Sequence, residues 1–340
     1  MSNVIIFGGT GFFGLFMAIR LSEQNKYNKI FLYDHEEIDE KDFGYRIKKY
    51  NSIKNIVFIK GCVKNEIIDF DGDDNISLII NLAAIHREPG HKNWEYYETN
   101  LNGATNIISW ADKIGCDHII FSSSISPYGL SEDLRDENSL TVPTSPYGGS
   151  KLVAEKIHQI WQSANHDRKK LIIVRPGVIF GPSEGGNVSR LIKAIKGNYF
   201  FYMGNHNTRK AGIYIKELTN FVVWLYEDQS IMKNKNFILA NATMNPGPSV
   251  SEYVESIKKI LKKEIFILSV PFGVLLTLSK ILDLFLSVFK INHPFSPVRI
   301  KKLVNSNNVI SSYARENNYS YIYDLDSALE DWKKECPEEW

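Results

Sequence analysis

The sequence has few cysteines, almost no net charge and no long uninterrupted apolar run. Its three cysteines, Cys62, Cys116 and Cys336, are odd in number and far apart, which argues against a disulfide framework or a metal knuckle. We therefore expect no metal site and a reducing, cytoplasmic setting. The 40 basic residues nearly balance the 39 acidic ones, so the chain lacks the basic field that nucleic-acid binding requires.

Two stretches are candidates for an export or membrane signal. The N-terminal MSNVIIFGGTGFFG has no basic region and reaches glycine after four apolar residues, so we do not expect a signal peptide. The most apolar run, residues 270–291, is interrupted by Lys280 and Asp283, which argues against a membrane-spanning helix. Its apolar residues follow helical spacing instead. We expect a helix that packs inside the protein or at an oligomer contact, or one that lies on a membrane surface.

The order of the elements predicts an α/β protein. In the first half, β-rich runs alternate with helical stretches, as in a parallel sheet covered by helices. We predict strands at 3–7, 29–33, 56–60, 77–82, 118–122 and 171–174, and helices at 12–24, 94–114, 147–165, 216–227, 250–263 and 326–335. We expect a Rossmann-like doubly wound parallel sheet in residues 1–180, to which some later elements return. Residues 181–340 would mainly form a smaller lobe over the carboxyl ends of the strands.

A glycine motif, Gly8-x-x-Gly11-x-x-Gly14, joins the first predicted strand to the first predicted helix. Gly8 would permit the tight turn, Gly11 would let a pyrophosphate approach the backbone, and Gly14 would let strand and helix pack closely. Asp34 follows 20 residues after Gly14 (34 − 14). A carboxylate there would bind ribose hydroxyls and repel a 2′-phosphate, which favours NAD over NADP. A glycine turn without a ligand, with Asp34 as a solvated charge, is the alternative interpretation.

Three Tyr-x-x-x-Lys pairs occur, at Tyr45–Lys49, Tyr50–Lys54 and Tyr147–Lys151. The first two lie in a charged stretch, and we expect them on the surface. The third begins a predicted helix, and Ser124 ends the strand segment upstream of it. Because residues i and i+4 share a helix face, Ser124, Tyr147 and Lys151 could converge on one substrate carbon. The alternative is an aromatic residue beside a charge on a helix surface.

A lysine so placed should change the acidity of the phenol. A unit charge about 4 Å away, at an effective dielectric constant near 20, is worth roughly 4 kcal/mol, or about three pKa units. We therefore expect the pKa of Tyr147 to fall from about 10 to about 7, where the phenol can act as a base.

These segments resemble the extended short-chain dehydrogenase/reductase superfamily, in particular its NAD-dependent nucleotide-sugar epimerases and dehydratases. The matching segments are GGTGFFG, NLAA, YYETNLNGATNII, FSSSISPYG, SPYGGSK and RPGVIFGP. The resemblance implies that Ser124 holds the reacting oxygen, Tyr147 is the base, and Lys151 also binds the nicotinamide ribose. The cofactor-binding residues that we assign are Gly8, Gly11, Phe12, Phe13, Gly14, Asp34, Leu82, Ala83, Ala84, Asn100, Ser122, Tyr147, Lys151, Pro176 and Val178.

The resemblance also narrows the reaction. Members of this family begin by oxidising a sugar to its 4-keto form. Dehydratases among them carry an Asp-Glu pair after the Ser/Thr, where this sequence has Ile125 and Ser126, so we do not expect dehydration. A keto-reductase would usually draw on NADPH, against which Asp34 argues. The resemblance therefore implies C4 epimerisation with NAD regenerated in each cycle. A net 4-dehydrogenase or 4-ketoreductase, and a non-catalytic dinucleotide-sensing or RNA-binding protein on this fold, are the alternatives.

The second half is similar to bacterial 4-epimerases of N-acetylhexosamines in surface polysaccharide biosynthesis, which act on UDP-sugars or on polyprenyl-diphosphate-linked N-acetylglucosamine. By position, this similarity implies that His86 faces the sugar and that Asn187, Lys210 and Arg299 lie at the substrate diphosphate. UDP-hexose epimerases usually have arginine where Lys210 stands, so the carrier of the sugar stays open. Solvated charges at Lys210 and Arg299, and a structural His86, are the alternatives.

Three further expectations follow from the resemblance. Relatives often form homodimers through a helix pair that here would be 94–114 and 147–165, so we expect a homodimer. Cys62 stands where relatives often have an acidic residue that contacts the adenine, so this contact should be lost or replaced. We expect a cytoplasmic enzyme, with residues 270–291 as the candidate for peripheral contact with the inner membrane face.

Overall fold

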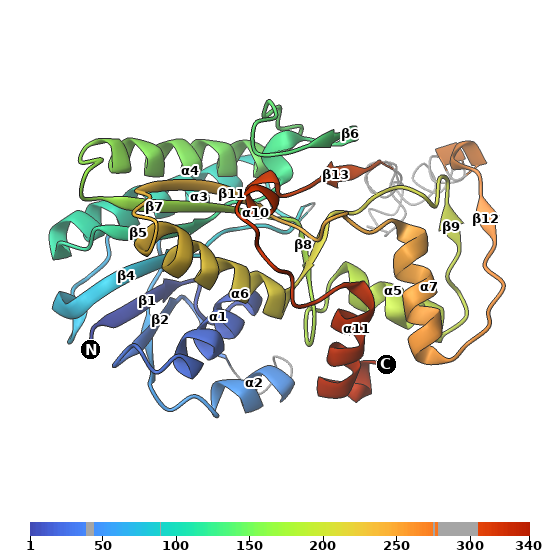
Figure 1. Cartoon of the computed structure of the whole chain (residues 1–340), viewed down its shortest axis with the longest axis horizontal. Helices are drawn as coiled ribbons and strands as arrows, with labels where there is room; N and C mark the ends of the chain where they lie inside the picture. The colour runs from blue at the N-terminus through green and yellow to red at the C-terminus, as the bar shows by residue number, and fades with distance from the viewer. Residues whose placement is uncertain (39–43, 89, 275, 278–304) are drawn as a thin grey trace.

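A seven-stranded parallel sheet forms the centre of the computed structural model, which describes residues 1–38, 44–88, 90–274, 276–277 and 305–340 (Figure 1). The strand order is β11-β7-β5-β4-β1-β2-β3. These strands are β1 (Asn3–Phe7), β2 (Ile30–Asp34), β3 (Ile56–Lys60), β4 (Ile76–Asn81), β5 (His118–Ser122), β7 (Lys170–Pro176) and β11 (Phe237–Ala242). The order reverses between β1 and β4, the place where doubly wound sheets bind ligands. The Rossmann-like fold class is confirmed.

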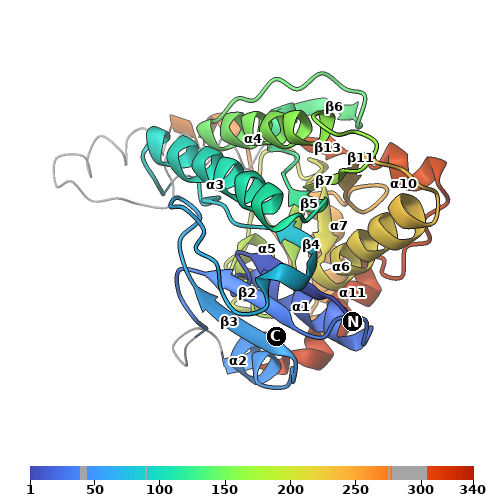
Figure 2. The same ribbon diagram turned by 90° about the vertical axis from the view of Figure 1, so that its left-hand side faces the viewer.

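Helices cover both faces of this sheet. Helices α3 (Asn93–Ile114) and α4 (Pro146–Ser163) lie side by side on one face, and α1 (Phe12–Glu23) and α6 (Ile215–Trp224) lie on the other (Figures 1 and 2). Strand β1 shows why: Val4 and Ile6 enter the core on the α1 face, and Ile5 and Phe7 enter the core on the α3 face. Strands buried on both faces are apolar throughout rather than alternating.

The smaller lobe lies beyond the carboxyl ends of the sheet strands (Figure 1). It contains α5 (Asn187–Lys196), α7 (Val250–Leu261) and α11 (Leu325–Glu335). Short parallel strand pairs lie outside the central sheet: β8 (Val178–Phe180) with β10 (Gly212–Tyr214), β9 (Tyr202–Met203) with β12 (Ser269–Val270), and β6 (Ser131–Arg135) with β13 (Asn307–Val309). The chain also forms the short helices α2 (Gly44–Tyr50) and α10 (Ser312–Glu316).

The predicted strands correspond to β1–β5 and β7 to within two residues at each end. The residue range of strand β11 was not predicted, although later elements were expected to return to the sheet; the strand comes from beyond residue 180 and pairs with β7 at the edge of the sheet. Most of the apolar run, residues 275 and 278–291, lies outside the described residues, as does Arg299. In the part of the chain that is described, no helix is long and apolar enough to cross a membrane.

One pair expected on the surface has a structural role. The ring of Tyr45 stacks on Phe16 of α1 with centroids 6.3 Å apart, and its hydroxyl donates to the Glu335 carboxylate on α11. Lys49 lies 3.5 Å from the same carboxylate. The expectation of a plain surface pair was therefore wrong for Tyr45, because a carboxylate 290 positions away in the chain covers it.

Candidate active site

The glycine turn leaves no room for side chains on its inner side. Gly8 has a φ of +76°, and a Cβ on it would lie 2.8 Å from the amide nitrogen of Ala83. A Cβ on Gly14 would lie 2.4 Å from the carbonyl oxygen of Gly8. Gly11 differs, because among the described residues a Cβ there would meet that carbonyl alone, at 3.1 Å. Gly11 also caps α1 without a side-chain hydrogen bond, so this outer side of the turn suits a pyrophosphate.

Replacing Gly14 with alanine should weaken binding of the expected dinucleotide by roughly tenfold or more, since overpacking costs about 1–3 kcal/mol. The measurement is the amount of NAD released from the denatured protein, together with the NAD dissociation constant by calorimetry. The matched control is Gly44→Ala in α2, where a Cβ would meet no atom of the described residues within 4 Å. Equal NAD content in Gly14→Ala and Gly44→Ala would show that the turn is not the binding site.

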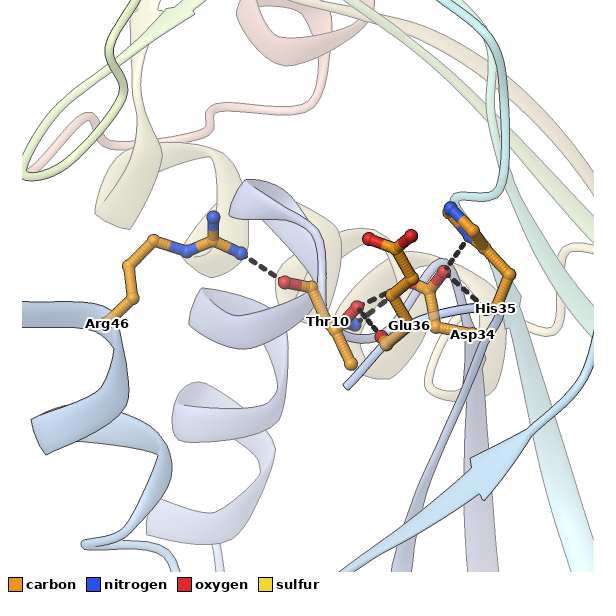
Figure 3. Close-up of polar contacts among 5 residues, drawn as sticks. All are labelled: Thr10, Asp34, His35, Glu36 and Arg46. Carbon is orange, nitrogen blue, oxygen red and sulfur yellow. Dashed lines mark hydrogen bonds and ion pairs between the residues drawn. The ribbon is translucent and has the colours of Figure 1, made fainter. Parts of the chain in front are cut away.

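Asp34 lies beside this turn at the end of β2 (Figure 3). Its Oδ2 accepts hydrogen bonds from the Thr10 amide at 3.2 Å and the Thr10 hydroxyl at 2.8 Å. Its Oδ1 accepts one from the His35 amide at 2.8 Å, and His35 Nδ1 lies at the same distance. Arg46 of α2 donates to the Thr10 carbonyl. Since a carboxylate offers about four acceptor positions, a ribose hydroxyl would share them with Thr10 and His35.

The structure brings Ser124 and Tyr147 together. Ser124 follows β5 and is buried; its Oγ accepts a hydrogen bond from the Ser126 amide at 3.1 Å and lies 3.0 Å from Ser126 Oγ. Tyr147 is in the first turn of α4, which Ser145 caps by accepting a hydrogen bond from the Gly148 amide at 3.2 Å. A hydrogen bond joins the Ser124 and Tyr147 side chains and favours the ionised phenol.

Lys151 is buried one turn further along α4, and its ammonium group faces Phe121. Its Nζ lies 4.4 Å from the centre of the Phe121 ring. Burial lowers the pKa of Lys151 to about 7, against the opposing effect of Glu155. Burial likewise raises the pKa of Tyr147 to about 12. The expected pKa near 7 for this phenol was therefore wrong in this geometry, because desolvation dominates and the ammonium faces Phe121.

Asn100, expected at the cofactor, makes its contacts within the protein. Its Oδ1 accepts from the Ile85 amide at 2.9 Å, and its Nδ2 donates to the Ile85 carbonyl at 3.2 Å and to Ser150 Oγ at 2.8 Å. Ser150 donates to the Tyr147 carbonyl at 2.8 Å. Asn100 thus fastens the segment after β4 to the first turn of α4. Its role at the cofactor stays a prediction.

The other predicted cofactor residues gather at the same edge of the sheet. Phe12 and Phe13 begin α1, and Ser122 ends β5. Leu82, Ala83 and Ala84 directly follow β4, Pro176 ends β7, and Val178 begins β8. Because these strands are parallel, all these positions lie at their carboxyl ends or directly beyond them.

The predicted substrate residues are spread over the sheet edge and the smaller lobe. His86 is exposed in the segment after β4. Asn187 is exposed at the start of α5, where its Oδ1 accepts from Arg190 at 3.2 Å. Lys210 donates to the carbonyl of Asn305, and burial lowers its pKa to about 8. Their roles in substrate binding stay predictions.

Sequence reasoning missed a buried ion pair next to this site. Arg175 of β7 donates to the Glu155 carboxylate of α4 through Nε at 2.8 Å and through a terminal nitrogen at 2.6 Å. The two side chains are 5% and 1% exposed, so the pair is almost dry. Ser123 donates to the same carboxylate. The available signal was Arg175 at the end of the otherwise apolar run LIIV.

Known proteins share both the sequence pattern and the fold. The NAD dependent epimerase/dehydratase family matches residues 4–240. The N-acetyl-alpha-D-glucosaminyl-diphospho-ditrans,octacis-undecaprenol 4-epimerase of Escherichia coli is 27% identical over 252 residues, which are 74% of this chain and 75% of that protein.

Two solved structures match the fold over nearly their full lengths. The UDP-glucuronic acid 4-epimerase of Bacillus cereus, in complex with NAD, has a TM-score of 0.75 at 19% identity and covers 99% of both chains. The UDP-N-acetylglucosamine 4-epimerase of Methanobrevibacter ruminantium has a TM-score of 0.74 at 18% identity, covering 100% of this chain and 99% of that one. This chain therefore belongs to the NAD dependent epimerase/dehydratase family, which confirms the resemblance and the cofactor expected from its sequence.

Proposed function

We propose that this protein is an NAD-dependent C4 epimerase of a diphosphate-linked hexose or N-acetylhexosamine. The observation that carries the proposal is the hydrogen-bonded pair Ser124–Tyr147 at the carboxyl edge of the sheet, with Lys151 buried one turn away. The glycine turn between β1 and α1 opens at the same edge. The relative from Escherichia coli, a 4-epimerase of a lipid-linked N-acetylglucosamine, supports this assignment.

The residues would divide the work as follows. NAD, when bound, supplies a hydride acceptor and donor for C4. Ser124, fixed by the Ser126 amide, holds the 4-hydroxyl against Tyr147. Tyr147 takes the hydroxyl proton and later returns it to the 4-oxygen. Because burial raises the pKa of this phenol, a cation must approach it first; the flexible stem of Lys151 allows its ammonium to turn from Phe121 toward the phenol.

Dehydration has no support at this site. A dehydratase needs an acid beside the leaving hydroxyl. The two residues after Ser124 are Ile125, which is buried and apolar, and Ser126, whose hydroxyl is not acidic at neutral pH. The intermediate 4-keto sugar would therefore keep its remaining hydroxyls and be reduced again at C4.

The substrate carrier is the finer part of the proposal. A diphosphate needs cationic and amide donors, which Asn187 and Lys210 supply from the smaller lobe. Lysine gives a point charge rather than a bidentate clamp, which suits a polyprenyl diphosphate as well as a UDP group. We place the enzyme in surface polysaccharide biosynthesis, on the basis of the undecaprenol-linked substrate of the relative.

The test is to offer the purified protein UDP-N-acetylglucosamine and the polyprenyl-diphosphate-linked sugar in separate reactions. We expect the C4 epimer from at least one of them and no net NADH. Steady accumulation of NADH would instead identify a 4-dehydrogenase. Absence of both NADH and epimer with either substrate would contradict the proposed function.

Two assembly features belong to this proposal. Helices α3 and α4 carry exposed apolar side chains, including Trp94 (56% exposed) and Ile160 (71%), which supports a homodimer through this helix pair.

In the smaller lobe Phe266 is 88% exposed and Leu268 is 63% exposed just before the run 270–291, which supports peripheral contact with a membrane at the cytoplasmic face. Sedimentation velocity tests the dimer, and pelleting with anionic liposomes tests the membrane contact.

A further inference from the structure

Lys151 and Glu155 form a buried, oppositely charged pair of positions on α4. They are four residues apart and therefore share one face of the helix, where Cβ atoms lie roughly 5–6 Å apart. Both are 1% exposed. Two buried, oppositely charged groups on one helix face influence each other's charge state, and the Glu155 carboxylate acts to raise the pKa of Lys151.

The Glu155 carboxylate is fixed in place by donors from two strands. Ser123, which directly follows β5, donates to it, and Arg175 of β7 donates to both of its oxygens. Arg175 is held in turn, because it also donates to the Tyr128 hydroxyl at 2.7 Å. Tyr128 donates to Asn241 of β11 at 3.0 Å. Glu155 is therefore an anion with a set position and little freedom to rotate.

The other charged and titratable groups near Lys151 do not favour its proton. His86 approaches from the segment after β4, and Tyr147 lies one turn earlier on α4. His158 lies one turn after Glu155; burial lowers its pKa to about 4, so it is neutral. Its ring stacks on Phe121 with centroids 4.1 Å apart. Arg175, from β7, is a cation that binds Glu155. Among these described groups, Glu155 is the one whose negative charge favours the protonated form of Lys151.

We propose that Glu155 is a positioning residue for the reaction: its fixed carboxylate keeps the Lys151 side chain charged, and its bond to Ser123 sets the position of the adjoining Ser124. The proposal rests on the proposed function for the catalytic meaning of Lys151. The charge state of Lys151 itself can be measured without any substrate. Burial lowers the pKa of Lys151 to about 7 even with Glu155 present, so loss of the carboxylate should remove its proton at a lower pH.

The experiment compares Glu155→Gln with Tyr128→Phe. Glutamine keeps the shape and one acceptor oxygen but removes the charge. Phenylalanine removes a hydroxyl from the same network and leaves the Glu155–Arg175 pair intact. The first readout is NMR of isotope-labelled lysine, in which the Lys151 resonance is the one absent from Lys151→Met. The second readout is the pH dependence of kcat, measured with whichever of the two candidate substrates the enzyme epimerises.

In Glu155→Gln we expect the titration midpoint of Lys151 to move to lower pH by about one unit. The pH at which kcat falls on the alkaline side should move with it, so that kcat at higher pH is about tenfold lower than in the wild-type enzyme. KM should change less than twofold. In Tyr128→Phe the melting temperature should fall while both pH midpoints stay in place. Midpoints that are unchanged in Glu155→Gln would overturn the proposal. If the Lys151 midpoint moves but the protein has no epimerase activity, the effect of Glu155 on Lys151 is supported and only the proposed function is contradicted.

Glu155→Gln leaves Arg175 buried without its counter-charge, which can prevent folding. The double variant Glu155→Gln/Arg175→Met removes both charges and is the second arm. If Glu155 acts on Lys151, the double variant should keep the lower Lys151 midpoint. If Glu155 serves only to neutralise Arg175, the midpoint should equal that of the wild-type protein, and the proposal fails.

Discussion

Replacing Tyr147 with phenylalanine is expected to lower kcat roughly 100- to 10 000-fold with little change in KM. The substitution removes one oxygen, the atom that is hydrogen-bonded to Ser124 and that would take the proton of the sugar hydroxyl. The ring should stay in place, because it packs beside Tyr96 with centroids 6.3 Å apart. The measurement is the initial rate of epimer formation, with circular dichroism and NAD content to show that the fold and the cofactor are retained.

The chain supplies a matched control for this variant. Tyr50 has the same spacing to a lysine, and its hydroxyl donates to Glu37 at 3.1 Å, away from Ser124. Tyr50→Phe should keep kcat within about twofold of the wild-type value, since the ring stays and the hydroxyl that is removed bonds to Glu37 rather than to Ser124. A Tyr147→Phe enzyme with more than a tenth of wild-type kcat would assign the proton transfer to another group.

Lys151→Met should have two opposite effects: a loss of kcat by about 100-fold or more, and a gain in stability near neutral pH. Lys151 is buried, and burial lowers its pKa to about 7. Above that pH the unfolded chain still binds a proton that the folded protein has released, so wild-type stability rises with pH between about 7 and 10.4. Below about pH 7 the folded protein carries the full cost of the buried charge. The gain from methionine should therefore be largest at low pH.

Urea unfolding at about pH 6 and about pH 9 measures this gain, which should be on the order of a few kcal/mol at the lower pH, since one pKa unit is about 1.4 kcal/mol. Lys156→Met is the control: Lys156 is exposed on the same helix, where it donates to Gln159 at 3.0 Å. It should change neither kcat nor stability appreciably. A Lys151→Met protein that is less stable than wild type at pH 6 would show that the buried lysine stabilises the folded protein rather than destabilising it.

The glycine turn and the central strands were predictable because their signals are local. Gly8, Gly11 and Gly14 lie within one short stretch that ends in the first turn of α1, and each apolar run of the sheet is a continuous stretch of sequence. Strand β11 has a similar composition, but its place beside β7 is set by pairing between Phe237 and Leu171, across the whole of α5 and α6. The residue pattern within one segment does not indicate which distant strand it pairs with.

The electrostatics of the site were less predictable. Spacing correctly placed Tyr147 and Lys151 on one helix, one turn apart. It did not indicate that the ammonium lies over Phe121, nor that burial acts on the phenol more strongly than any charge. The Glu155–Arg175 pair joins α4 to β7 across 20 positions, and only packing brings the two side chains together.

In the proposed reaction, the hydrogen at C4 of the sugar leaves as a hydride and returns to the same carbon, while Tyr147 takes up and returns the hydroxyl proton. The direct measurement uses each candidate substrate deuterated at C4, with NMR of the product formed in ordinary water. We expect a C4 epimer that retains its deuterium. A product that has exchanged the label for solvent hydrogen would contradict it, because the carbon would then have been deprotonated rather than oxidised.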